Sequence, residues 1–434
     1  MRKWILWGFG LALCRLAAAQ TPSPATSPLV LSLRDAMERA RANSPQLLSA
    51  SIDALIAHED TRQAKASLLP TAEFFSQYIY TQGNDTPTGR YVSNDGVHVY
   101  NDQLQVHGDL WAPVKLADYH KAQLAEAVAH AKAEVAARGL IATVVGDYYA
   151  MVSAGRKVAN ARQSLQEAQH FADITQKLER GGEAAHYDTV KAESQVLDRQ
   201  RDLQEAQLAV DKARLSFAVL LFPNFRQDFS VQDDLDATPE LPPFPQIQAL
   251  ASNNSPDIRA AEAAVGEQRY EYKSVRAEYL PSVSFDYFYG INANNFGVDN
   301  RYGQSNLGSV AQAQLNLPVW NWGITKSRVK QAQLRVEQAN NDLTLAQRTL
   351  LSELNQYYLE AGVAEGQIAT LRRSLELANE ALRLTVLRYQ GGEGSVLEVV
   401  DAQTTVVTAR NAYNDGMVRY RLAVANLQTL TGEF

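Results

Sequence analysis

Two kinds of hydrophobic periodicity follow one another along the chain. Four segments alternate apolar and polar side chains residue by residue, which is typical of β-strands with one apolar face. The pattern predicts strands at about 71–80, 103–111, 282–291 and 309–317. A polar segment rich in Gly, Asn and Asp separates the strands of each pair, 81–101 in the first and 292–306 in the second.

Helical periodicity dominates the rest. Residues 324–390 contain no proline, and at 1.5 Å per residue a helix of this length would reach about 100 Å. Small and apolar residues then recur three and four positions apart from Val399 to Leu430, and the first half mirrors this between Ala192 and Leu220. This spacing predicts long, closely packed, antiparallel coiled-coil helices.

The whole pattern occurs twice. The motif Asn-Ser-Pro at 43–45 returns at 254–256, and Arg-Gly-Gly-Glu at 180–183 returns as Gln-Gly-Gly-Glu at 390–393. Because several such motifs return in the same order and at nearly the same separation, they indicate an internal duplication. In each copy the predicted order is helix, helix, strand, strand, long helix, glycine turn and helix.

The duplication sets the predicted domain boundaries. The two structural repeats span 31–223 and 242–431, and a linker at 224–241 with prolines at its end joins them. Residues 20–30 form an N-terminal linker and 432–434 a C-terminal tail.

The first 19 residues are typical of a secretory signal peptide. A basic start precedes a short apolar run and the small residues Ala17-Ala18-Ala19. The single cysteine, Cys14, lies in this segment, and the sequence before it partly resembles a lipoprotein signal, although Leu13 is larger than the residue that usually precedes such a cysteine. Cleavage after Ala19 would leave no thiol; the exact cut and the lipidation of Cys14 stay open alternatives.

Composition narrows the function further. A net charge of −7, more negative once the signal is removed, argues against a nucleic-acid partner. No segment has the roughly 18–20 apolar residues of a membrane-spanning helix, but the predicted strands are long enough to cross a bilayer. Since lipid does not tolerate an open sheet edge, four strands could enter a membrane only by pooling with those of other chains.

The candidate chemistry is sparse. The glycine turns lack the Lys-Ser/Thr of a phosphate-binding loop, and the seven histidines show no metal-ligand spacing, so we expect neither a cofactor nor a metal centre. Glu398 and Asp401 share one helix face three residues apart. On spacing alone, this pair fits a solvated helix face or the acid/base pair of an enzyme.

The duplicated order resembles the TolC family of outer-membrane efflux channels over essentially the whole mature chain. The resemblance rests on the Asn-Ser-Pro turns, on "ASLLP" and "AEYLP" before the strands, and on "GGE" turns followed by "YDTVKAESQ" or "VLEVVDAQTT". It implies a mainly α fold in which a homotrimer forms a 12-stranded transmembrane β-barrel, four strands per chain, and a long helical tunnel. It also implies contact with outer-membrane lipid, a long periplasmic extension and no enzymatic activity.

The same resemblance implies roles for single residues. Glu398 and Asp401 match acidic residues at the closed periplasmic end of the pore, where a threefold axis would turn each into a ring of carboxylates that favours cations and can bind divalent ions. Tyr389 and Asp188 match a donor and an acceptor that latch the tip. The family's tip arginine falls at Gly394, so that link is absent here and its replacement is an open question.

The resemblance also implies partners. A periplasmic adaptor (membrane fusion protein) and an inner-membrane pump of the RND or ABC type would dock at the hairpin turns around Gly181, Gly182, Gly391, Gly392 and Gly394. The expected function is a passive outer-membrane channel of a tripartite efflux or type I secretion system, which the adaptor and pump open. The alternative is a secreted structural coiled coil or adhesin without a pore. The sequence identifies neither the cargo nor the pump type.

Overall fold

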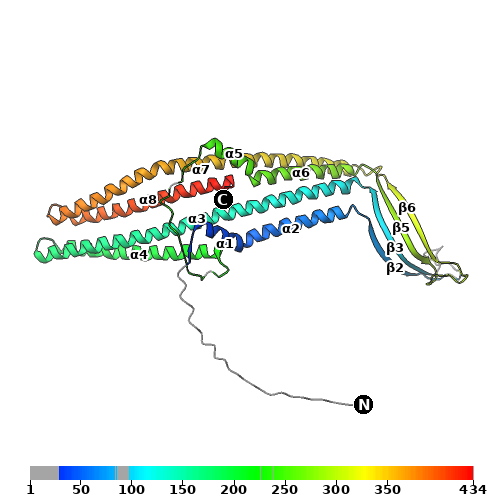
Figure 1. Cartoon of the computed structure of the whole chain (residues 1–434), viewed down its shortest axis with the longest axis horizontal. Helices are drawn as coiled ribbons and strands as arrows, with labels where there is room; N and C mark the ends of the chain where they lie inside the picture. The colour runs from blue at the N-terminus through cyan, green and yellow to red at the C-terminus, as the bar shows by residue number, and fades with distance from the viewer. Residues whose placement is uncertain (1–28, 84, 86–96, 225, 238, 434) are drawn as a thin grey trace, which may run out of the picture.

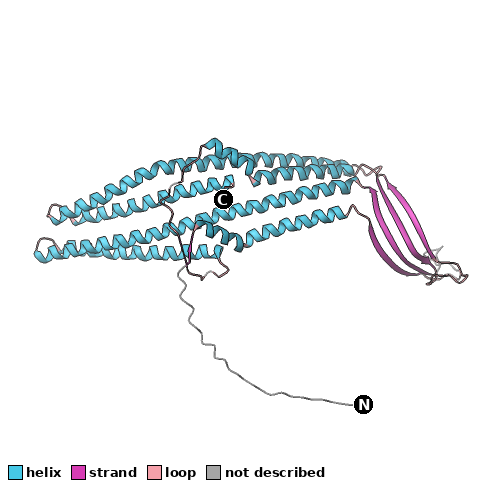
Figure 2. Cartoon of the chain, in the orientation of Figure 1, coloured by secondary structure: helices cyan, strands magenta, loops and turns pink. Residues whose placement is uncertain are grey.

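The computed structural model describes residues 29–433 except 84, 86–96, 225 and 238. The predicted signal peptide at 1–19, including Cys14, lies outside the described residues. The described chain is elongated, with long helices side by side and one curved sheet at the far end (Figure 1). Strands and helices are separated along the long axis, apart from two very short strands near the middle (Figure 2).

The two halves of the chain have the same element order. The first half contains α1 (Leu33–Asn43), α2 (Pro45–Ala66), β2 (Thr71–Tyr80), β3 (His98–Trp111), α3 (Pro113–Gly181) and α4 (His186–Leu221). The second contains α5 (Phe244–Asn254), α6 (Pro256–Ala277), β5 (Ser282–Ala293), β6 (Leu307–Asn316), α7 (Ile324–Gln390) and α8 (Val396–Thr431). The predicted long helices are confirmed, at 69 residues for α3 and 67 for α7.

The Asn-Ser-Pro motif has the same structural role in both halves. Ser44 and Ser255 cap the helices that follow them, because each hydroxyl accepts a hydrogen bond of 3.3 Å from a backbone N–H three residues later. The proline after each serine occupies the first helical turn, where no backbone donor is needed. Asn43 and Asn254 donate to the last carbonyls of the returning helices, at 2.9 Å to Leu221 O and 3.1 Å to Thr431 O. The motif therefore fixes the start of one helix against the end of another.

The four long strands form one antiparallel sheet in the order β2-β3-β5-β6. Its register aligns the alternating faces across the strands. Phe74, Leu104, Tyr289 and their neighbours form an apolar face, and Glu73 and Gln105 lie on the opposite, mainly polar face. Strands β2 and β6 each have one edge without a partner among the described residues.

Several strand boundaries differ from the prediction, and β6 spans Leu307–Asn316 rather than 309–317. β3 begins at His98, five residues earlier than expected, because it pairs with β2 as far as Tyr80. β5 continues to Ala293, so both predicted loops are shorter than the polar composition suggested. A bulge between Asp109 and Trp111 shifts the register where β3 meets the helical region.

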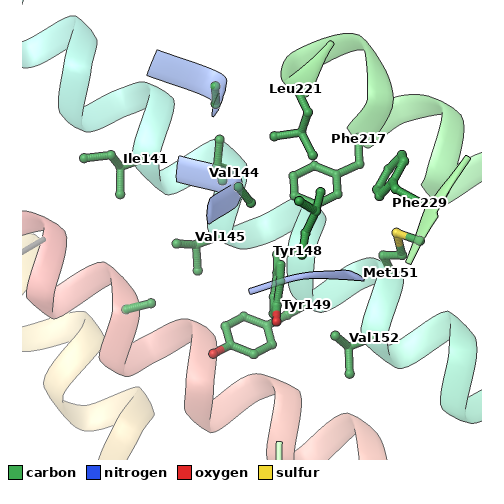
Figure 3. Packing of buried hydrophobic residues seen from close by; sticks show 14 of the residues in the cluster. Ile141, Val144, Val145, Tyr148, Tyr149, Met151, Val152, Phe217, Leu221 and Phe229 are labelled. Atoms are coloured by element: carbon green, nitrogen blue, oxygen red, sulfur yellow. The ribbon is translucent and has the colours of Figure 1, made fainter. Parts of the chain in front are cut away.

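Two short strands lie where linkers were predicted. β1 (Leu29–Leu31) pairs in parallel with β4 (Phe229–Val231), which ties the N-terminal segment to the connection between the halves. Phe229 packs with Phe217 of α4 and Tyr148 of α3 in the central core (Figure 3). The Tyr148 hydroxyl donates to the carbonyl of Gln232 at 2.6 Å, so the connection is held by polar contacts as well as by packing.

Only α3, among the described helices, is long and apolar enough in composition to cross a membrane. Its residues Leu140, Val144, Tyr148 and Val152 are buried in the core between α1, α4 and β4. Packing inside the protein therefore accounts for part of the apolar character of this helix, since 44% of its most apolar stretch is buried.

Candidate gate at the tips of the helical hairpins

The hairpins α3–α4 and α7–α8 reverse direction through two equivalent turns. Gly182 and Gly392 have left-handed backbone angles, φ +75° and +76°. At each turn two backbone bonds close the helix end: Gly182 N–H donates to Glu179 O at 2.9 Å, and Gly392 N–H to Tyr389 O at 3.1 Å, each with a longer-range bond beside it. This is the Schellman pattern, in which glycine carries no steric cost. Both predicted turns lie at the same end of the molecule, opposite the sheet (Figure 1).

Gly394 lies close to the backbone at the end of α7, so a side chain there would be tightly packed. A Cβ atom there would lie 3.2 Å from the backbone nitrogen of Tyr389 and 3.4 Å from its Cα. The close approach of the turn to the last residues of α7 thus explains why the backbone favours glycine. A larger residue here would require the turn or the end of α7 to shift by a few tenths of an ångström.

Tyr389 and Asp188 lie within hydrogen-bonding distance. The Tyr389 hydroxyl donates to Asp188 Oδ2 at 3.1 Å, which joins the end of α7 to the start of α4. The ring is 5% exposed and packs edge-on against Phe171 of α3, with centroids 5.1 Å apart. Burial, and then the hydrogen bond to Asp188, raise the pKa of Tyr389 to about 12, so its hydroxyl is a donor throughout the neutral pH range. The contact links the two hairpins of one chain.

Glu398 has partners within its own hairpin. The Ser395 hydroxyl caps α8 by accepting from Glu398 N–H at 3.4 Å, and the same hydroxyl donates to Glu398 Oε1 at 3.3 Å. Arg388 lies 3.4 Å from Glu398 Oε2 and also donates to the carbonyl of Glu393 at 3.1 Å. The charge of Glu398 is therefore partly offset by Arg388.

Asp401 is different. Its side chain is exposed, and within the described residues it makes no hydrogen bond or ion pair. Only its backbone carbonyl has a contact, accepting from the Thr405 hydroxyl at 3.0 Å. Of the two predicted gate carboxylates, Asp401 is the one whose charge remains uncompensated within the chain.

Two buried arginines join the hairpins above the tip. Arg410 of α8, 7% exposed, forms a two-pronged ion pair with Glu167 of α3 at 2.7 and 3.2 Å. Arg199 of α4, 8% exposed, donates to the Thr404 hydroxyl of α8 at 2.9 Å. The Arg410–Glu167 pair orients its two helices strongly, because separating them would leave a buried charge without its ion-pair partner. Arg199 also pairs with Asp202 of its own helix at 3.0 Å, so its contact with Thr404 adds a hydrogen bond between the hairpins rather than a charge pair.

These arginines were missed by the sequence analysis, although one left a signal. The apolar spacing between Ala192 and Leu220 has a gap between Val196 and Leu203, and Arg199 fills it. A charged residue at a core position of a coiled coil is a sign that it has a specific partner. Arg410 has no such signal, because it lies beside the apolar stripe rather than within it.

The exposed surfaces of the outermost helices also carry apolar stripes. On α4 the stripe contains Val190, Leu197, Leu208, Leu215 and Val219, 46 to 67% exposed. On α7 it contains Leu334, Leu345, Leu359, Val363, Leu377 and Leu384, 47 to 66% exposed. α2 adds Leu48, Ile52 and Leu55 at 46 to 63%. Stripes of this length are typical of surfaces that pack against another protein.

A sheet with one apolar face, continued by two long helical hairpins, is the fold of outer-membrane channels. The CmeC outer membrane channel from Campylobacter jejuni has this fold, with a TM-score of 0.82 at 17% identity over 99% of this chain and 94% of that one.

The sequence comparisons point to the same proteins. Residues 248–433 match the family model described as "Outer membrane efflux protein". TolC from Vibrio cholerae is 22% identical over 413 residues, 92% of this chain and 90% of that protein. The proteases secretion protein PrtF from Dickeya chrysanthemi is 22% identical over 94% of this chain and 89% of its own length. The chain is therefore a homologue of TolC and the other outer membrane efflux proteins, as the sequence resemblance predicted.

Proposed function

We propose that this protein is a passive outer-membrane channel of a tripartite efflux or type I secretion system. The observation that carries the proposal is the continuity of one open sheet with two helical hairpins, each built on one helix of about 100 Å. The sheet's apolar face suits lipid and its polar face suits a water-filled lumen. The helices below it would form the wall of a periplasmic tunnel.

Assembly with further copies of the chain would close the sheet into a barrel and the helices into a tunnel. In lipid the free edges of β2 and β6 need partners, and each can pair with the other edge of a neighbouring copy. Helix α7 lies at the same side of the molecule as β6, while α2 and α4 lie at the side of β2 (Figure 1). A head-to-tail ring would therefore cover the stripes and the edges together. Three copies, the number that the family resemblance implies, would give a 12-stranded barrel.

The tip would be the gate. Asp401 would form a ring of three carboxylates that favours cations, and Glu398 a weaker one because Arg388 offsets its charge. The Tyr389–Asp188 hydrogen bond and the buried Arg410–Glu167 pair would hold the two hairpins together in the closed state. In this scheme the buried pair compensates for the tip arginine of the family, whose position Gly394 occupies.

Opening would come from outside the chain. A periplasmic adaptor would contact the hairpin turns and an inner-membrane pump would supply the energy. Relatives named for protease secretion and for pyoverdine export indicate that this architecture serves different cargoes. The turns at Gly182 and Gly392 are the exposed ends that such a partner would reach first.

Membrane fractionation, light scattering and bilayer recordings test the proposal. We expect the full chain in the outer-membrane fraction, a trimer in detergent and discrete conductance steps in planar bilayers. A soluble product that does not conduct would instead support the secreted coiled coil or adhesin. Hydrolytic activity lost on substitution of Glu398 and Asp401 would support an enzyme.

A further inference from the structure

All three tryptophans of the described residues lie where the sheet meets the helices. Trp111 ends β3, and Trp320 and Trp322 lie between β6 and α7. Their side chains are 54, 76 and 87% exposed. Tryptophan favours the boundary between lipid and water, because its ring is apolar and its N–H needs a polar partner. The junction is thus the level at which the proposed channel would leave the membrane on its periplasmic side.

A hollow of about 390 Å³ lies beside Trp111 at the start of α3. Its apolar lining includes Leu68, Leu110, Leu116 and Tyr270. Leu110 and Leu116 are 69 and 49% exposed, so the chain itself leaves this apolar surface open. Trp111 is in register with Val283 on the apolar face of the sheet, which makes the hollow continuous with the proposed lipid-facing surface.

One face of α6 places positive charge next to the hollow. Arg269, Lys273 and Arg276 follow at spacings of four and three residues, so they share a helix face, and all three are exposed. Lys273 lines the hollow, with its Nζ 4.0 Å from the ring centroid of Tyr270. Within the described part of the chain no carboxylate lies within ion-pair distance of any of the three. In a protein with a net charge of −7, this is a local reversal of sign.

The simplest alternative is a solvated helix face that has no ligand. It accounts for the three cations but not for the open apolar hollow beside them. A free phosphate ion would satisfy the cations and leave Leu110, Trp111 and Leu116 in water. A phospholipid suits both the cations and the apolar hollow. Its phosphate is anionic, and its glycerol and upper acyl carbons are apolar.

We propose that this hollow binds a phospholipid of the periplasmic leaflet, with its phosphate at Lys273 and Arg276 and its acyl chains against Trp111 and Leu116. The site would fix the depth of the channel in the membrane at one defined point of each chain. The proposal rests on the proposed function, because a soluble protein would not meet this ligand. Its chemistry nevertheless belongs to residues of one chain and needs no neighbouring copy.

Native mass spectrometry of the full-length protein, titrated with dioleoyl phosphatidylglycerol in detergent, tests the site. The double variant Lys273→Gln/Arg276→Gln should bind this lipid about twenty-five-fold more weakly, since each cation near an anionic lipid contributes a factor of about five. The matched control is Lys132→Gln, an exposed lysine on α3 about 28 Å from the start of that helix, which should leave the affinity unchanged. Because these side chains are exposed, neither change should disturb folding, which circular dichroism checks.

Two further arms identify the source of the ligand. Inorganic phosphate in large excess should not displace the lipid, and Leu116→Gln should weaken lipid binding although it removes no charge. Displacement by phosphate, or equal lipid affinity of wild type and double variant, would overturn the proposal. Conductance measured in parallel separates the two hypotheses. If the wild type conducts but does not bind this lipid preferentially, only the lipid site is contradicted. If it neither inserts nor conducts, the proposed channel function is contradicted.

Discussion

In the proposed channel, the hydroxyl of Tyr389 is a single group on which the closed state of the tip would depend. Tyr389→Phe keeps the packing on Phe171 and removes only the hydrogen bond to Asp188. A hydrogen bond to a charged acceptor contributes about 1.5–3 kcal/mol, so the ratio of closed to open channels should fall about tenfold or more. We expect larger single-channel conductance or more frequent opening in planar bilayers, and the same direction for Asp188→Ala.

Tyr413→Phe is the matched control for this change. Its hydroxyl accepts from Arg372 at 3.1 Å, but both residues belong to the α7–α8 hairpin, so the bond does not join the two hairpins. Conductance should stay at the wild-type level. Equal behaviour of both phenylalanine variants would contradict a latch at Tyr389.

The two carboxylates after the turn should differ in their effect on ion selectivity. Asp401 has no partner among the described side chains, whereas Glu398 is paired with Arg388 and bonded to Ser395. We expect Asp401→Asn to reduce the preference for cations strongly and Glu398→Gln to reduce it little. Reversal potentials across a potassium chloride gradient measure this preference. A larger effect of Glu398→Gln would show that the pairing with Arg388 does not persist in the assembled pore.

At the scale of whole elements, the reversal of each hairpin depends on one glycine of the pair. Gly392→Ala places a Cβ on a left-handed residue at a cost of about 1–2 kcal/mol, although no other atom lies within 4 Å of it. Gly391 has a negative φ, so Gly391→Ala should be nearly neutral. Hydrogen exchange of the amides around the turn should accelerate about fivefold or more in the first variant only. Similar exchange in both variants would mean that the turn relaxes into another conformation.

The elements also differ in how far the sequence predicts them. Helix α7 and strand β2 were predicted to the residue, and β6 to within two residues, because their periods persist over many positions. β1 and β4, three residues each, are too short to show a period. Each is defined by its pairing with the other. The start of β3 was missed because Asn101 and Asp102 read as loop, although pairing with β2 extends the strand through them.

In the candidate site, too, some contacts could be predicted from the sequence and others could not. The pairing of Tyr389 with Asp188 followed from family resemblance, and the structure places the two groups together. The partner of Glu398 could not be predicted, because the approach of Arg388 depends on the geometry of the turn between them. The same holds for Gly394, whose role is visible only from its distance to the backbone of Tyr389.

At the scale of the whole molecule, the exposed stripes of α4 and α7 are the main feature that one chain leaves unexplained. Leu208 on α4 is 53% exposed, and its neighbour Ala209 is exposed as well but points about a quarter to a third of a turn away. If α4 packs against another copy, Leu208→Glu should bury an unpaired charge at that contact, whereas Ala209→Glu should not. We expect the first variant to dissociate into monomers, or to lose most of its trimer, in light scattering of the detergent-solubilised protein. The second should remain trimeric. A Leu208→Glu variant that stays trimeric would show that α4 faces water or lumen in the assembly, and the ring would then have to close through other surfaces.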